Sequence, residues 1–200
     1  MQMSRKQMDD LSELFNIAAG RAISALADLS DRRVLLNVPH VEILAVPKLS
    51  STLGKFIEGE VATVYQIFSG AVDGSAMIML DYSGAVQLVD LIAGNGHGPQ
   101  PHLDESRTEV FTEIGNILLN ATMSAFGDIL EKRITFSVPK IHLNALDSLI
   151  HSMTIDNHEL QEAMIAYTLF KIETVNFAGY LVVIMSVTSL EKLITALDAG

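Results

Sequence analysis

The strongest constraint on this chain is an internal repeat with an offset of 100 residues. Residues 13–43 and 113–143 align without a gap and share nine identities. Each window contains a Glu, an Asn three residues later and a Pro separated from the Asn by 22 residues. Self-similarity at a fixed offset is typical of duplicated structural units. We therefore interpret the chain as one domain made of two repeats, at about residues 1–95 and 102–200, joined by a Gly/Pro-rich loop at 94–101.

Composition narrows the possible function classes. With 200 residues, of which 49% are hydrophobic and 18% charged, the chain is globular and long enough to bury a core. A net charge of −11 without a basic stripe argues against nucleic acid or an anionic membrane as a partner. Cysteine is missing from the sequence, so disulfides and thiolate metal sites are excluded. No signal-peptide core is visible, and the longest apolar run, at 180–185, is too short to span a bilayer, so we expect a soluble cytoplasmic protein.

A long helix is expected in each half. The first is expected to begin at Ser4, which forms a capping box with Gln7, and to run to about residue 29; the second is expected over residues 104–130. Apolar residues at spacings of three and four define one buried face of each helix. The expected inward positions are Leu11, Phe15, Ala18, Ala22, Ala25 and Leu29, and then Phe111, Gly115, Leu118, Thr122, Ala125 and Ile129.

Polar residues with the same spacing define the opposite face of each helix. They are Asp9, Glu13, Asn16 and Gly20 in the first helix, and Glu109, Glu113, Asn116 and Asn120 in the second. Residues three and four apart are neighbours on a helix surface, so each Glu lies beside its Asn. Both Asn side chains are expected to point to solvent.

Apolar alternation predicts strands in both halves. They are expected at 34–43, interrupted at Pro39, at 61–68 and at 75–80, and again from 134, at 164–172 and at 179–187, with five extra residues around 147–158. A polar, irregular segment is expected at 48–59. Ser83 is expected to cap a short helix, and a closing helix is expected from Ser189. The predicted class is α+β: two pseudo-symmetric helix–strands–helix halves forming one antiparallel sheet of about six strands packed with helices.

Signatures of other chemistries are weak. The six histidines lack the spacing of a helical metal site, so no metal site is expected. Gly94, Gly96 and Gly98 follow a helix and precede Pro99, which favours a hinge over a phosphate-binding loop. A single exposed Glu/Asn pair is most simply a solvated helix face. Two pairs in register across the repeat favour a functional role.

These pairs resemble the motif of the CheC-type phosphatases of bacterial and archaeal chemotaxis. That motif is Asp or Ser, then Glu, Asn and Pro at the spacings seen here, and it commonly occurs twice in a chain. It matches at Asp9, Glu13, Asn16 and Pro39, and at Glu113, Asn116 and Pro139. Glu109 stands where the family has Asp or Ser. The resemblance covers essentially the whole chain. A related flagellar-switch fold lacks the Glu/Asn pairs, so their presence favours the enzyme.

The resemblance implies hydrolysis of the phospho-aspartate on a response regulator similar to CheY. Asn16 and Asn116 would orient the attacking water, since a carboxamide can both accept and donate hydrogen bonds. Glu13 and Glu113 would dock against a basic side chain of the regulator. Asp9, Gly20, Glu109 and Asn120 are expected to line the partner-binding surface. The regulator is expected to supply Mg²⁺ and a Lys, so the chain needs no cofactor of its own.

The resemblance also bears on partners and on the ranking of the two sites. It allows a CheD-like receptor deamidase as a second partner, and it predicts a monomer because both modules lie in one chain. The alternative function is a non-catalytic binding module of the flagellar-switch or adaptor class. Phe15 and Gly115 occupy the same place between Glu and Asn, and a Gly there allows close packing. We therefore expect Asn116 to carry more of the activity than Asn16.

Overall fold

The computed structural model describes residues 3–30, 33–57, 59–93, 102–145, 148–150, 161–172 and 175–199. Its helices are α1 (Arg5–Ser30), η1 (Val46–Lys48), α2 (Leu49–Leu53), α3 (Tyr82–Ala93), α4 (Glu105–Leu130) and α6 (Val187–Ala199). Its strands are β1 (Val34–Ala45), β2 (Glu60–Gly70), β3 (Gly74–Asp81), β4 (Ile134–Phe136), β5 (Lys140–Ala145), β6 (Glu162–Ile172) and β7 (Val175–Met185). The predicted loop at 94–101 and most of the extra residues at 147–158 lie outside the described residues.

One antiparallel sheet contains all of these strands, which confirms the predicted fold class. The strand order is β1-β6-β7-β3-β2-β4, and β5 also pairs with β2. The expectation of about six strands is one short, because the strand after α4 is split into β4 and β5 on either side of residues 137–139. A Pro at 139 has no N–H to donate, which favours this interruption.

Strand pairing interlocks the first and second halves of the chain. The first-half strand β1 pairs with β6, whereas the second-half strands β4 and β5 pair with β2. The hairpins β2–β3 and β6–β7 meet in the centre through β3 and β7. The edge strand of each half therefore lies on the hairpin of the other half, and the sheet forms only when both halves fold together.

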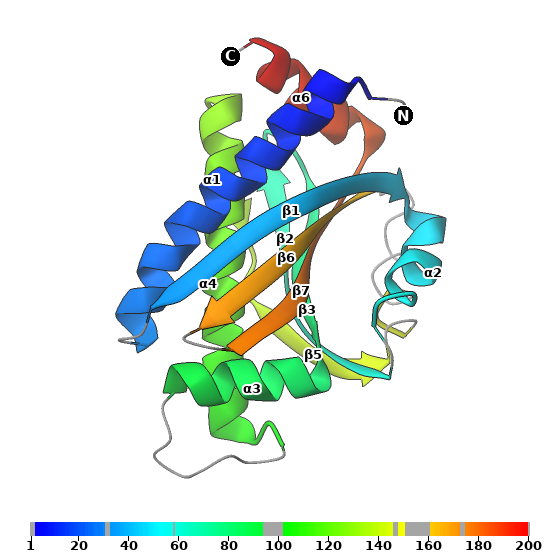
Figure 1. Ribbon diagram of the computed structural model, residues 1–200. Coiled ribbons are helices and arrows are strands. Elements are labelled where there is room, and N and C mark those ends of the chain that lie inside the picture. Colours follow the sequence, from blue (N-terminus) through cyan, green and yellow to red (C-terminus); the bar gives the residue numbers. More distant parts are fainter. Residues whose placement is uncertain are drawn as a thin grey trace.

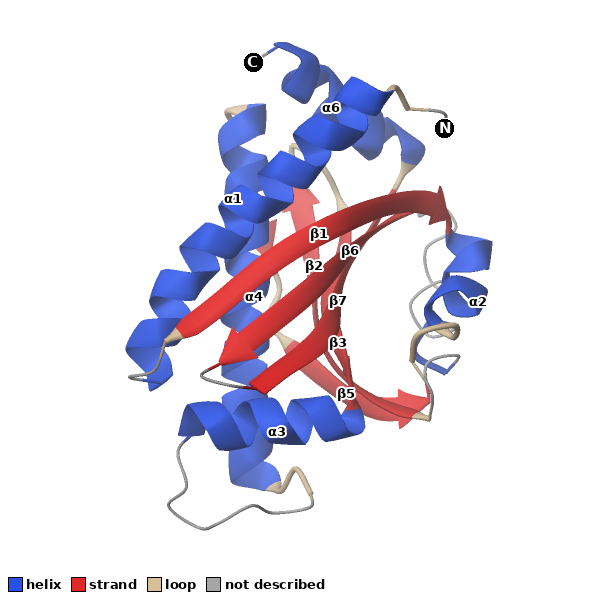
Figure 2. Cartoon of the chain, viewed as in Figure 1, coloured by secondary structure: helices blue, strands red, loops and turns tan. Residues whose placement is uncertain are grey.

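Helices cover the sheet unequally. The long helices α1 and α4 cross on one side of the sheet, with α3 and α6 near its opposite ends, and α2 lies on the other side (Figures 1 and 2). Strand β2 illustrates the alternation, since Val64 and Phe68 enter the larger core beneath the long helices while Val61 enters the smaller core beneath α2. Strand side chains alternate between faces, so each strand serves both cores.

The segment at 48–59 differs from its prediction. It was expected to be irregular, but it contains the end of η1 and all of α2. Leu49 and Leu53 lie one helical turn apart and are fully buried in the smaller core. Burying a Leu side chain contributes about 1.5–3 kcal/mol, which outweighs the weak local helix signal of this short segment.

Local signals at the helix starts are partly confirmed. The capping box at α1 is present: Ser4 N donates to Gln7 Oε1 (3.0 Å) and Gln7 N donates to Ser4 Oγ (3.2 Å). Ser83 does not cap α3. Instead, the carboxylate of Asp81 accepts hydrogen bonds from the Ser83 hydroxyl and from Gly84 N, because Asp81 ends β3 directly before the helix.

The buried face of α1 also deviates near its end. Ala25 is exposed and Leu29 is 43% exposed, whereas Leu26 is fully buried. Leu29 lies 18 residues, or five full helical turns, after the buried Leu11, so its exposure does not come from the helical phase. It lies next to the C-terminal end of α1 at Ser30, where the helix leaves the core. The other inward positions of α1 are buried as predicted. No helix in the described parts of the chain is long and apolar enough to cross a membrane.

Candidate functional site

The first candidate site lies where α1 meets β1. Glu13 and Asp9 are exposed on α1, as predicted, but Asn16 is half-buried. Its Oδ1 accepts a hydrogen bond from Val38 N (3.1 Å), and its Nδ2 donates to Val38 O (3.2 Å) and to Ser12 O (3.0 Å). The prediction that Asn16 points freely to solvent is therefore wrong. Its carboxamide is bonded to the backbone of a strand 22 residues away.

A β-bulge explains why Asn16 bonds to Val38. The pairing of β1 with β6 passes from Asn37↔Leu169 to His40↔Tyr167, so two residues of β1 oppose Thr168 alone. The extra residue of a bulge leaves backbone groups unpaired, and Pro39 has no N–H. The Asn16 side chain bonds both the N–H and the C=O of Val38, as a neighbouring strand would. In the first half, this geometry gives the spacing between Asn16 and Pro39 a structural reason.

The second candidate site lies where α4 meets β2. Glu109 and Glu113 are exposed, and Asn116 and Asn120 are half-buried. Asn116 Oδ1 accepts hydrogen bonds from Asn120 Nδ2 (2.9 Å) and from Gln66 Nε2 (3.1 Å). Asn116 Nδ2 makes no hydrogen bond to any described residue.

Gln66 distinguishes this site from the first. In the sheet, Tyr65 pairs with Lys140 as Tyr167 pairs with His40, so Gln66 takes the place that Thr168 has in the other half. Thr168 donates to its own strand, at Ala166 O (3.1 Å), and leaves the bulge to Asn16.

The second half has a corresponding bulge, because residues 137–139 lie opposite only Gln66 and Ile67 of β2. The longer Gln66 side chain reaches this bulge itself, since its Nε2 donates to Ser137 O (3.3 Å). The two bulges consequently differ in how tightly they pack. Val38 is 3% exposed, whereas Val138 is 80% exposed. We describe the first site as closed and the second as open.

Ion pairs hold the two long helices in place around the sites. The Arg21 guanidinium contacts the Asp128 carboxylate at 2.7 Å and links α1 to α4. Arg107 contacts Asp90 at 2.5 Å and donates to Val86 O (3.3 Å), which links the start of α4 to α3. Neither Glu113 nor Glu109 forms an ion pair with a described residue. The open site is therefore an acidic surface on which the Asn116 NH₂ group bonds to no described residue.

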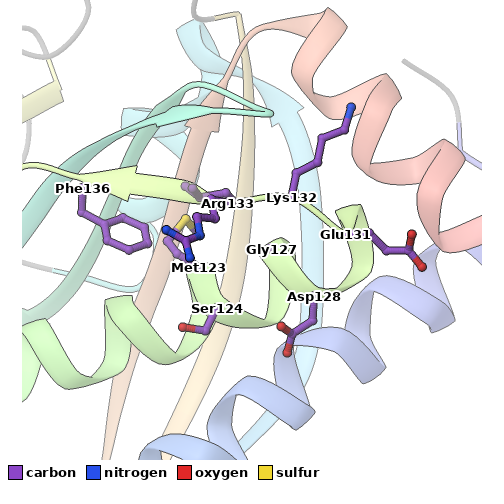
Figure 3. A pocket seen from close by; sticks show the side chains of 9 residues that line it. Met123, Ser124, Gly127, Asp128, Glu131, Lys132, Arg133 and Phe136 are labelled. Carbon is purple, nitrogen blue, oxygen red and sulfur yellow. The ribbon is translucent and has the colours of Figure 1, made fainter.

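A metal site or a cleft would be a further feature that could bind a ligand. Across the described residues, no group of three or more His, Cys, Asp or Glu side chains is arranged to hold a metal ion. A cleft opens at the C-terminal end of α4, where the side chains of Asp128, Glu131 and Lys132 point outward around Gly127 (Figure 3). Neither the Glu13/Asn16 pair nor the Glu113/Asn116 pair lines this cleft.

Sequence reasoning missed Gln66, Val38 and Ser137 as parts of the sites. One signal was available for Gln66. It lies in phase with Val64 and Phe68, which face the helices, and a polar residue at such a position must find a hydrogen-bond partner. The roles of Val38 and Ser137 are carried by backbone groups, which the sequence does not mark.

The chain is similar to known proteins and to solved structures that share an antiparallel sheet packed by helices. The "CheY-P phosphatase CheC" of Bacillus subtilis is 26% identical over 203 residues, covering 99% of this chain and 97% of that protein. The "Flagellar motor switch phosphatase FliY" of the same organism is 28% identical over 142 residues, covering 70% of this chain and 36% of that protein. No family profile matches the chain.

Solved structures agree on the fold. Thermotoga maritima FliY superposes with a TM-score of 0.80 at 22% identity, covering 100% of this chain and 99% of that chain. The FliM middle domain from H. pylori has a TM-score of 0.69 at 10% identity, covering 97% of this chain and 99% of that chain. A CheC-like superfamily protein from Shewanella sp. PV-4 has a TM-score of 0.53 at 12% identity, covering 91% and 98% of the two chains. The resemblance to the CheC-type family is therefore confirmed, and it extends over nearly the whole chain.

Proposed function

We propose that this protein is a phosphatase that hydrolyses the phospho-aspartate of a CheY-like response regulator. The observation that carries the proposal is the open site, where the Asn116 NH₂ group makes no hydrogen bond to a described residue and lies on the same helix face as the exposed Glu113. Similarity to a CheY-P phosphatase along nearly the whole chain supports the same conclusion.

The proposed reaction needs positioning rather than a nucleophile on this chain. A water oxygen forms a bond to phosphorus while the bond from phosphorus to the Asp carboxylate oxygen breaks, and the electron pair leaves with that carboxylate. The proton of the water passes to a phosphoryl oxygen of the product. An acyl phosphate is already reactive, and the regulator supplies Mg²⁺ and a Lys that neutralise charge. Asn116 holds the water in line, and correct placement alone lowers the barrier substantially.

Glu113 provides the docking contact in this proposal. It lies about one helical turn before Asn116 on the exposed side of α4, so a regulator that contacts one side chain also contacts the other. An ionised Glu forms strong charge-assisted hydrogen bonds with Lys or Arg. Glu109 and Asn120 extend the same face of α4 on either side of the pair.

The first site differs from the second in the hydrogen bonds of its Asn. Glu13 is exposed, as Glu113 is, but both the oxygen and the NH₂ group of the Asn16 carboxamide are hydrogen-bonded to the Val38 backbone. Asn16 can contribute to hydrolysis only when these hydrogen bonds open. We therefore assign most of the activity to the second site.

Phosphate release from a phosphorylated regulator tests the function. The regulator, charged with a small phosphodonor and then separated from it, should lose phosphate several-fold faster with the protein than without it. The double variant Asn16→Ala/Asn116→Ala, assayed at a temperature where it is fully folded, should lose most of the acceleration. A protein that binds the phosphorylated regulator but leaves its lifetime unchanged is instead a binding module of the flagellar-switch or adaptor class.

A further inference from the structure

A row of three side-chain amides connects the open site to the sheet backbone. Asn120 Nδ2 donates to Asn116 Oδ1 (2.9 Å), and Gln66 Nε2 donates to the same oxygen (3.1 Å). Gln66 Nε2 also donates to the backbone oxygen of Ser137 (3.3 Å). Gln66 is only 3% exposed, so this row begins inside the protein and ends at its surface.

The backbone carbonyl of Ser137 determines which group donates and which accepts in each hydrogen bond of the row. A carbonyl oxygen only accepts, so the Gln66 atom that faces Ser137 O must be the NH₂ group. The same NH₂ group faces Asn116, which must therefore present its oxygen. Because that oxygen is turned toward Gln66, Asn120 also has to donate to it. The orientation of Asn116 thus follows from a backbone group that cannot reverse its polarity.

The consequence is a single orientation of Asn116 at the surface. Its oxygen accepts two hydrogen bonds, while its Nδ2 bonds to no described residue. The first site is different, because the backbone of Val38 engages both the oxygen and the NH₂ group of Asn16. Within the described parts of the two sites, the second presents a fixed NH₂ donor without a hydrogen-bond partner, and the first does not.

We propose that Gln66 is a positioning residue, which holds Asn116 so that its NH₂ group, not its oxygen, contacts the reacting centre. This inference rests on the proposed phosphatase function and deepens it. The Asn116 NH₂ group donates to one lone pair of the attacking water, whose other lone pair forms the bond to phosphorus. Asn116 accepts no proton in this arrangement, so the water proton goes directly to a phosphoryl oxygen. Asn120 supports the orientation from the surface side.

Kinetics of Gln66→Leu test the positioning role. Leu has a similar volume but no amide, so Asn116 loses its inner donor and can rotate. We expect the rate at saturating phosphorylated regulator to fall about tenfold, with the half-saturating concentration changed less than twofold. In an Asn116→Ala background, Gln66→Leu should cause no further loss, because a positioning residue acts only through the group that it positions. An equal loss in both backgrounds overturns the proposal.

The matched control is Thr168→Ser, at the equivalent place in the other half of the sheet. It keeps the hydroxyl that donates to Ala166 O, and it is distant in register from the Gln66 row. Its turnover should equal that of the unsubstituted protein. Near-ultraviolet and far-ultraviolet circular dichroism of Gln66→Leu should match the unsubstituted protein, so that loss of fold is separated from loss of position.

Side-chain amide exchange measured by NMR tests the orientation without any assay of activity. In the free protein, the Gln66 and Asn16 NH₂ protons should exchange slowly with solvent, because each group donates two hydrogen bonds. The Asn116 NH₂ protons should exchange at least tenfold faster. Protected Asn116 protons would contradict the orientation even if the protein is a phosphatase. Absence of phosphate release with the expected exchange pattern would contradict the function while the orientation stands.

Discussion

Gly115 lies so close to Val64 that a β-carbon at position 115 would come within 2.4 Å of the Val64 Cβ. Phe15, at the same place in the first half, is buried and packs edge-to-face on Phe126 with ring centroids 5.7 Å apart. In the sheet, Ala166 has the register position of Val64. In the first half, the large Phe15 is on the helix and the small Ala166 is on the strand. In the second half, the small Gly115 on the helix faces the larger Val64 on the strand. This close approach brings α4 onto β2 and places Asn116 within reach of Gln66.

Substitution of Gly115 tests this packing. We expect Gly115→Ala to lower the free energy of unfolding by about 1–3 kcal/mol, because the added methyl overpacks against Val64. Turnover should fall as well, since α4 must move away from β2. Urea unfolding followed by circular dichroism measures the first effect. Gly20→Ala is the control: nothing lies within 4 Å of its added β-carbon, so it should stabilise the protein by about 0.5–1 kcal/mol. Equal stability of Gly115→Ala and the unsubstituted protein would refute the argument.

The two Asn residues should differ in their contribution to stability. Asn16→Ala leaves the N–H and C=O of a buried Val38 without partners, which should lower the free energy of unfolding by about 1–3 kcal/mol. Asn116→Ala leaves Gln66 still bonded to Ser137 O, so its effect should stay below about 1 kcal/mol. Urea midpoints of the two single variants give the comparison. Two Asn side chains that both pointed to solvent, as expected from the sequence, would give equal and small losses of stability. A larger loss for Asn116→Ala than for Asn16→Ala would contradict this ranking.

Activity should rank the sites in the opposite order. We expect Asn116→Ala to lower the rate of phosphate release by about a hundredfold at the second site, equivalent to about 2.7 kcal/mol of transition-state stabilisation. Asn16→Ala should reduce total release by less, because the Asn16 carboxamide is already bonded to Val38. Rates are compared at a temperature where both variants are fully folded. If Asn16→Ala causes the larger loss, the closed site is the active one.

Alkaline pH should weaken the protein partly through Tyr167. Burial, and then the hydrogen bond from its hydroxyl to Glu42 (3.1 Å), raise the pKa of Tyr167 to about 12. The folded state then holds the phenol proton more tightly than the unfolded chain, where the pKa is about 10. This stabilisation is therefore complete below about pH 10 and is lost as the pH rises toward about 12. Unfolding free energies between pH 9 and 12 should fall less steeply in Tyr167→Phe, and identical slopes would exclude this role.

We also expect a monomer in solution. Both modules lie in one chain, and the edge strands of the sheet carry Pro bulges, at Pro39 in β1 and at Pro139 between β4 and β5. Interrupted edges disfavour pairing with a second copy. Multi-angle light scattering over a hundredfold range of concentration checks this expectation. A constant mass near twice 21.7 kDa would contradict it.

Much of the fold was predictable because helical and strand periods are local. The capping box and the apolar spacing located α1 and α4 to within one or two residues, and the 3.6-residue period placed Glu13 and Glu113 on exposed faces. Predictions failed where a distant contact decided the outcome. Leu49 and Leu53 formed a helix because the smaller core covers them, and Asp81 capped α3 because β3 brings its carboxylate to the helix start.

The sequence by itself determined which residues the two modules share: a Glu, an Asn and a Pro at fixed spacing, on helices and strands of predictable type. Only the tertiary structure decided what each Asn does. Strand β1 crosses to the hairpin of the other half, where the short Thr168 leaves the bulge backbone to Asn16. Strand β2 presents Gln66 instead, whose longer amide bonds Ser137 O and the Asn116 oxygen, while the Asn116 NH₂ group bonds to no described residue. Hydrogen-bond partners depend on which segments meet in space, so two motifs with the same Glu, Asn and Pro spacing acquire different hydrogen bonds.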